Sequence, residues 1–237
     1  MELLEKLHIP LCPPQRIPVK TLVEQLQPTP ADKKIIESHI ASMKLVSLLN
    51  EQTIHIRPYK DDDYSYQAIY VFLIELKKDD SITSLSHLIH SAFPEPTVLI
   101  YKRIDAYYIS LASKRINKIE QGKTVVEDVV ITQIPSSITL EQLSLKNITG
   151  TNLREYYHSI INWFYKLKVL HITKVYPQKD LDFKTLLKQY EQTKSDIHKL
   201  KEAYKKASMK SDKMRIDDEL YDKEIEIKKL INKMQDN

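Results

Sequence analysis

Glycine and cysteine are almost missing from this sequence. Its 237 residues include two glycines, Gly122 and Gly150, and one cysteine, Cys12. Two glycines so far apart cannot form a G-x-x-x-x-G-K-[ST] phosphate loop or a G-x-G-x-x-G dinucleotide fingerprint. A single cysteine excludes a disulfide within the chain and any zinc cluster built on several cysteines. The chain is therefore not itself a P-loop ATPase, and if ATP is involved, a partner hydrolyses it.

Long apolar runs and a strong charge of one sign are also missing. No run approaches the roughly 20 apolar residues that cross a bilayer. The first residues lack the basic start and apolar core of a signal peptide, so we expect a cytoplasmic protein. The net charge of +4 is too small to indicate nucleic-acid binding by itself. With 42% hydrophobic residues, the chain can form a sizeable core.

Three sections of the chain differ in composition. Residues 1–28 are punctuated by prolines and contain at most one short helix, at residues 19–26. Residues 29–175 alternate helical and strand patterns, and residues 181–237 carry a heptad pattern. We therefore predict a proline-rich N-terminal segment, a folded domain and a helical tail.

The middle section predicts an α+β domain with a mixed β-sheet and flanking helices, in the order α-β-β-β-α-β-β-β-α. Helices are expected at residues 30–41, 79–93 and 151–170, and strands at residues 43–49, 53–57, 67–77 and 124–134, with a hairpin at residues 97–113 turning at 104–106. Both faces of the strand 67–77 are apolar, which is typical of a central strand.

The tail has apolar residues in steps of four and three, as in a coiled coil. Ala207 and Ile216 are nine residues apart, which breaks the phase between two such seams. We predict an antiparallel helical hairpin that folds back at residues 208–214, and one continuous dimerising helix is the alternative. The seam residues expected to bind a partner are Ile197, Leu200, Tyr204, Leu220, Ile227 and Leu230.

Three stretches resemble a known family. They are "HLIHSAFPEPTVLIY" at residues 87–101, "ISLASKRINK" at 109–118 followed by "VVEDVVITQI", and "LSLKNITGTNLREYYHSII" at 143–161. The chain resembles domain of unknown function family 4391. Members of that family lie in bacterial phage-defence and restriction-type gene neighbourhoods, beside helicases and DNA methyltransferases. The resemblance implies an accessory protein of a defence system and supplies no catalytic residue.

The end of the strand 67–77 raises a catalytic alternative. Glu75 and Lys77 form the Glu-x-Lys of a PD-(D/E)xK nuclease, in which two carboxylates hold Mg²⁺ and the lysine positions the attacking water. Asp61, Asp62 and Asp63 precede the strand and would lie roughly 26 Å from Glu75 at the rise of a strand.

A second carboxylate would therefore have to come from a neighbouring strand. Antiparallel pairing across the loop 58–66 would place residues 49–51 opposite Glu75, so that only Glu51 completes the site. The structural alternative is a core strand that ends in charged residues at the surface.

Two further sets of residues are candidates for binding. His87 and His90 stand three residues apart on a predicted helix. The only third metal ligand nearby is Glu95, beyond a proline break, so a solvated or half-buried pair is favoured. Basic residues cluster in sequence around the hairpin, where tyrosines are interleaved. They could bind phosphates and stack bases, or they could protect a sheet edge from aggregation. These basic residues are Lys102, Arg103, Lys114, Arg115 and Lys118.

Three functions remain open at the level of the sequence. The first is a non-enzymatic accessory subunit of an antiviral complex, without cofactor or metal, that docks onto a helicase or DNA methyltransferase. The second is a Mg²⁺-dependent nuclease that uses Glu75, Lys77 and Glu51. The third is an adaptor that binds DNA without sequence specificity.

Overall fold

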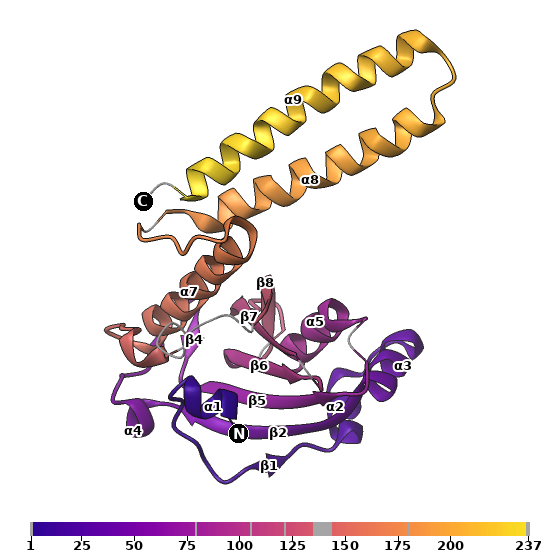
Figure 1. The fold of residues 1–237 in the computed structure, drawn as a ribbon. Helices are drawn as coiled ribbons and strands as arrows, with labels where there is room; N and C mark the ends of the chain where they lie inside the picture. The colour runs from indigo at the N-terminus through magenta and orange to yellow at the C-terminus, as the bar shows by residue number, and fades with distance from the viewer. Residues whose placement is uncertain are drawn as a thin grey trace. The chain divides into compact units, whose positions relative to one another are not determined.

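The chain divides into two compact units, one ending at Ile161 and the other beginning at Asn162. A computed structural model describes residues 2–78, 80–104, 106–120, 122–134, 144–179 and 181–235 (Figure 1). The division falls inside a helix, earlier than the change of sequence character after residue 175. In the described residues, no helix is long and apolar enough to cross a membrane.

A mixed six-stranded sheet forms the centre of the first unit, in the strand order β1-β2-β5-β6-β7-β8. The strands are β1 (Gln15–Arg16), β2 (Ile40–Leu49), β5 (Ile69–Leu76), β6 (Thr97–Lys102), β7 (Tyr107–Ile116) and β8 (Thr124–Gln133). Strands β5 and β6 are parallel and the other neighbours are antiparallel. The predicted α+β fold with a mixed sheet is confirmed, and β5 is the central strand that its two apolar faces indicated.

Three helices pack against one face of this sheet: α2 (Val19–Leu26), α3 (Pro30–His39) and α5 (Ile82–Ala92). Thr29 caps α3 by accepting a hydrogen bond from the Asp32 amide, and Pro30 occupies the first turn, where both residue types are favoured. The shared core consists of Leu22, Ile36, Ile40, Met43, Phe72, Ile74, Leu76, Ile82, Leu85, Ile89, Leu99 and Tyr101.

The start of helix α7 (Leu153–Thr173) fastens onto the sheet within the first unit. The Tyr157 hydroxyl donates to the Thr97 carbonyl at 2.8 Å and accepts from the Ala112 amide at 3.1 Å. Smaller elements complete this unit. They are α1 (Glu2–Lys6), α4 (Glu51–Ile54), the ribbon of β3 (Tyr59–Lys60) and β4 (Ser65–Tyr66), and the 3-10 helix η1 (Leu145–Asn147).

Two local predictions are wrong. Residues 53–57 are not a strand, because Asn50 caps a short helix there and exchanges hydrogen bonds with Thr53 in a capping box. The first 28 residues hold two helices rather than one, since α1 precedes α2. Leu3, Leu4 and Leu7 are all buried, which explains why this short segment is ordered.

The second unit contains a helical hairpin made by α8 (Phe183–Lys206) and α9 (Lys210–Gln235). Phe183 and Leu186, near the start of α8, share a core with Met234, near the end of α9, so the two helices are antiparallel (Figure 1). The chain turns at residues 207–209, and α9 begins at Lys210, inside the link that was expected at residues 208–214. The predicted hairpin is confirmed and the continuous helix is wrong. A coiled-coil geometry stays a prediction.

Candidate functional site

Glu75 lies half-buried in β5, next to two neighbouring strands. Its carboxylate accepts a hydrogen bond from the Ser42 hydroxyl of β2 at 2.8 Å. Ser42 and Lys102 are its partners in the β2 and β6 ladders. The immediate neighbours of this carboxylate across the sheet are therefore a hydroxyl and a lysine.

Lys77 makes separate contacts just beyond the end of β5. Its ammonium donates to the Glu37 carbonyl in the last turn of α3 at 2.9 Å, a position where the helix end favours a cation. Its own carbonyl accepts from the Arg103 guanidinium at 2.6 Å. These bonds join the ends of β5, α3 and β6, whereas Glu75 bonds to β2.

Glu51 is not opposite Glu75. The register pairs Leu49 with Ile69, at the start of β5, so Glu51 lies near the other end of that strand. The six residues from Ile69 to Glu75 span roughly 20 Å. The expected pairing was wrong because residues 53–57 do not form the strand that would have brought Glu51 into place. Among the described residues, no group of three or more His, Cys, Asp and Glu side chains could hold a metal ion.

The basic residues of the β6–β7 hairpin lie at two ends of it. Lys102 pairs with Tyr107 at the turn, which the Arg103 amide closes by donating to the Ala106 carbonyl; residue 105 lies outside the described residues. Arg115 is eight residues along β7 from Tyr107, roughly 27 Å away. The five residues adjacent in sequence therefore do not form one continuous patch.

Arg115 and Lys118 form ion pairs at that far end. The Arg115 guanidinium lies 3.6 Å from Glu127, and the Lys118 ammonium lies 2.7 Å from Asp63. The hydrogen bond to Asp63 raises the Lys118 pKa. Both side chains remain substantially exposed, so their charges stay accessible to a charged ligand.

Lys114 is buried, not part of an exposed patch: its exposed fraction is 4%. Its ammonium donates to the carbonyls of Phe93 at 2.7 Å and Glu95 at 2.8 Å, and it lies 3.5 Å from the Thr97 hydroxyl. Burial lowers the Lys114 pKa to about 7, and the negative charge of Glu95 opposes that shift. Lys114 is buried because side chains alternate along a strand, which places it with Ser110 on the helix-covered face of β7.

His90 belongs to the same buried cluster, whereas His87 is exposed. The Nδ1 atom of His90 lies 2.6 Å from the Thr97 hydroxyl, and its Nε2 atom lies 3.0 Å from the Ser110 hydroxyl. Burial and the nearby Lys114 hold the His90 pKa well below its usual value. A serine beside a histidine resembles a nucleophile and its base, but here the other nitrogen bonds to threonine rather than to a carboxylate. The cluster holds α5 on the sheet.

The hairpin of the second unit is closed at its base. We define the hairpin base as the buried residues Val169, Phe183, Leu186, Leu187 and Met234. The seam residues predicted to bind a partner are less covered. Ile197, Leu200, Leu220, Ile227 and Leu230 are half-buried.

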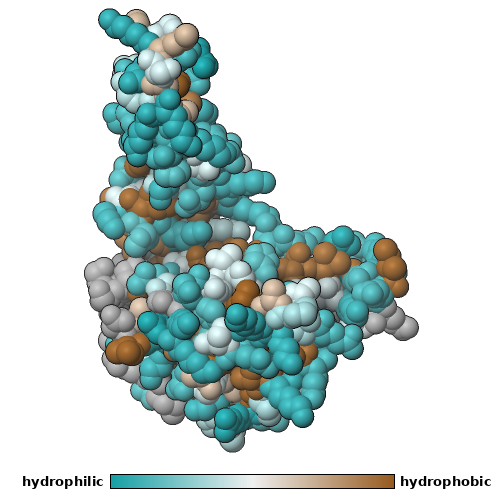
Figure 2. All heavy atoms as spheres, turned by 90° about the vertical axis from the view of Figure 1, so that its right-hand side faces the viewer, coloured by the Kyte–Doolittle hydropathy of each residue, from teal (hydrophilic) through white to brown (hydrophobic). Residues whose placement is uncertain are grey.

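The hairpin is open toward its tip. We define the tip surface as Tyr204, Met209, Met214 and Tyr221, whose exposed fractions are 38%, 65%, 62% and 67%. Figure 2 shows brown and tan apolar atoms among the hydrophilic ones at this end. Beside the tip surface, the two helices border a groove of about 450 Å³ whose lining includes Tyr204, Leu220, Lys201 and Asp217. Apolar contact area and charges of both signs thus lie together.

The two units together define an α+β protein with a C-terminal helical hairpin. The chain belongs to the family described as "Domain of unknown function (DUF4391)", whose model matches residues 13–227. Searches of curated proteins and of solved structures found no match.

Proposed function

We propose that this protein is a non-enzymatic accessory subunit of a cytoplasmic antiviral complex, and that its hairpin docks onto a helicase or DNA methyltransferase. The observation that carries the proposal is the tip surface, where four large side chains are exposed within the span of residues 204–221. The family resemblance suggests the class of partner.

The chemistry of the tip surface favours a protein partner. Tyrosine is enriched in the residues that dominate binding energy at protein interfaces, and methionine adapts its shape to an irregular apolar surface. The groove beside it could accept an apolar anchor residue from the partner. Lys201 and Asp217 at its border would add charge complementarity and select among partners.

The proposal is tested with a defined partner rather than a lysate. The full chain and a helicase or DNA methyltransferase from the same organism are purified, and their affinity is measured by calorimetry. The combined Met209→Ser and Met214→Ser variant should bind at least about tenfold more weakly, because two apolar contacts are lost. Ile119→Ser, an equally apolar change at a residue that is 93% exposed in the first unit, should bind like the wild type.

Both variants should keep the wild-type melting temperature, since the substituted side chains are mostly exposed. Wild-type affinity in the methionine variant would contradict the proposal. An equal loss in Ile119→Ser would place the interface elsewhere.

A further inference from the structure

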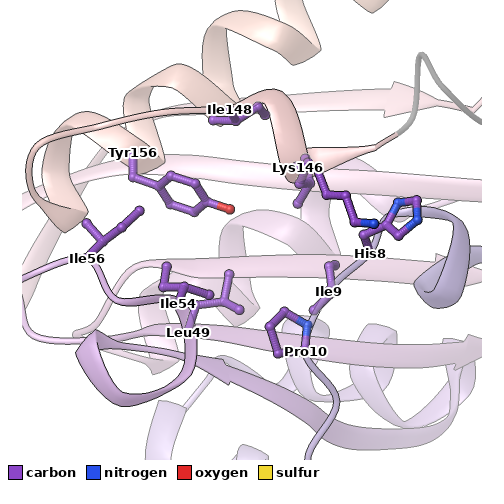
Figure 3. A pocket seen from close by; sticks show the side chains of 10 residues that line it. His8, Ile9, Pro10, Leu49, Ile54, Ile56, Lys146, Ile148 and Tyr156 are labelled. Atoms are coloured by element: carbon purple, nitrogen blue, oxygen red, sulfur yellow. The ribbon is translucent and has the colours of Figure 1, made fainter.

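A pocket of about 230 Å³ lies within the first unit, where the N-terminal segment, the end of β2, the residues around α4, the 3-10 helix η1 and the start of α7 meet (Figure 3). Leu49, Ile54 and Ile148 contribute apolar walls. The family match begins at residue 13, so the His8 side of the pocket lies outside the matched stretch.

The charged side chains that the structure describes at this pocket are basic. Among the described residues, its lining includes His8 and Lys146 and no aspartate or glutamate. Figure 3 draws these two basic side chains toward one end of the pocket and the isoleucines Ile54 and Ile56 toward the other. A site with a basic end and an apolar end fits an anionic head joined to an apolar body.

Tyr156 adds a further polar group that faces the pocket. Its side chain points into the pocket between the two ends, and only 7% of the residue is exposed. Its hydroxyl forms no hydrogen bond with any other residue that the structure describes. Burial raises the Tyr156 pKa, which keeps the hydroxyl protonated and able to donate. Because none of the described residues accepts from this hydroxyl, it can donate to a ligand in the pocket.

We infer that this pocket binds a small carboxylate with an apolar chain of about six carbons. The carboxylate would accept hydrogen bonds from Lys146, His8 and the Tyr156 hydroxyl, and the chain would lie against Ile54 and Leu49. One lysine and one histidine suit a single negative charge better than a doubly charged phosphate ester. At about 30 Å³ for each water-sized group, the volume holds roughly eight non-hydrogen atoms, the number in hexanoate.

This inference does not depend on the proposed docking of the hairpin. A ligand here would instead fix the N-terminal segment, which η1 already contacts through the hydrogen bond from the Leu145 amide to the Leu7 carbonyl at 3.1 Å. Bound carboxylate should therefore slow hydrogen exchange at the Leu145 amide, a readout that is independent of affinity.

The test is calorimetric titration of the full chain with hexanoate, with the neutral hexanamide and with butyl phosphate. Hexanoate should bind saturably at millimolar concentration or below, and hexanamide should bind at least about tenfold more weakly because it lacks the charge. Lys146→Met, His8→Ala and Tyr156→Phe should each weaken hexanoate binding by about fivefold or more. Lys123→Met, a change at an exposed lysine outside the pocket, should leave it unchanged.

Three results would overturn the inference. They are hexanoate that does not saturate, hexanamide that binds equally well, and wild-type affinity in all three pocket variants. Tighter binding of butyl phosphate than of hexanoate would overturn the assignment of a carboxylate. Because Lys146 and His8 are exposed, their substitution should leave the melting temperature unchanged, which separates lost binding from lost folding.

Discussion

The first unit buries a lysine and two histidines, Lys114, His39 and His90, whereas the second unit leaves two methionines and two tyrosines exposed. The first unit departs from the usual distribution by burying polar residues, and the tip surface departs from it by gathering four exposed large side chains within residues 204–221. The most exposed isoleucines of the first unit, Ile104 and Ile119, lie at opposite ends of β7 instead. In the first unit, Lys114 and His90 find hydrogen-bond partners among neighbouring hydroxyls and backbone carbonyls. The cost of burying these two side chains is therefore offset within the unit.

At the tip surface, Tyr204 has a cation–π contact with the Lys213 ammonium at 5.6 Å, but among the described residues Met209, Met214 and Tyr221 have no comparable compensation. Apolar side chains gain nothing from water, and their burial requires a surface from outside the hairpin. At the hairpin base, by contrast, apolar side chains of the chain's own helices bury one another. This difference teaches that unusual residues in the first unit maintain the fold, while those at the tip are available for binding.

The largest expected effect separates the hairpin base from the tip. Leu186→Ala should lower the free energy of unfolding by about 2–4 kcal/mol, because it leaves a cavity in a buried cluster. Met214→Ala, at a residue that is 62% exposed, should change it by less than about 0.5 kcal/mol. Urea denaturation followed by fluorescence measures both, since Trp163, the single tryptophan, lies in the second unit.

An equal loss of unfolding free energy in Leu186→Ala and Met214→Ala would contradict this difference between base and tip, because Met214 would then be part of the core. Unchanged stability in Leu186→Ala would show that the hairpin base is not a packed core. Leu187→Ala provides a second probe of the base if Leu186→Ala fails to express.

The next effect concerns the buried lysine and its dependence on pH. Lys114 has a pKa of about 7 in the folded protein and about 10.4 when unfolded. Between these values the unfolded chain binds more protons, so stability should rise with pH, by about 1.4 kcal/mol per pH unit at most. Between pH 7.5 and 9.5 this contribution amounts to about 2 kcal/mol, and Lys114→Met should abolish it.

The measurement is chemical denaturation at several pH values within that window, followed by far-ultraviolet circular dichroism. Lys123→Met is the matched control, because Lys123 is exposed, and its pH profile should parallel that of the wild type. A Lys114→Met profile that also parallels the wild type would show that this lysine is not buried in solution.

The sequence predicted elements whose signals are local. The apolar faces of β5 placed it at the centre of the sheet, Thr29 and Pro30 marked the start of α3, and the nine-residue gap before Ile216 predicted the hairpin. It misplaced groups whose position depends on register. Glu51 was expected opposite Glu75 because residues 53–57 were taken as a strand.

The buried cluster of the first unit was harder to predict because its members come from separate elements. His90 and Ser110 are twenty residues apart and meet only because α5 packs on β7. Lys114 did carry a signal, since it has the same parity as Ser110 and Ala112 on an alternating strand. The pocket carried no sequence signal, because His8, Lys146 and Tyr156 are brought together by tertiary structure alone.

The smallest expected effect concerns an ion pair between the two helices in the distal part of the hairpin. It tests how much this pair contributes to the stability of the second unit. The Lys201 ammonium of α8 lies 3.6 Å from the Glu224 carboxylate of α9, and their side chains are 55% and 49% exposed. Exposed pairs of this kind contribute about 0.2–1 kcal/mol and are screened by salt. Lys201→Glu should therefore destabilise the second unit by about 1 kcal/mol or less, and adding Glu224→Lys should restore most of the loss. Denaturation at low salt and at about 1 M salt, where the Debye length is about 3 Å, measures the pair. A loss well above 1 kcal/mol that persists at high salt would mean that internal packing holds the distal hairpin together. That result would weaken the proposal that the tip surface binds a partner.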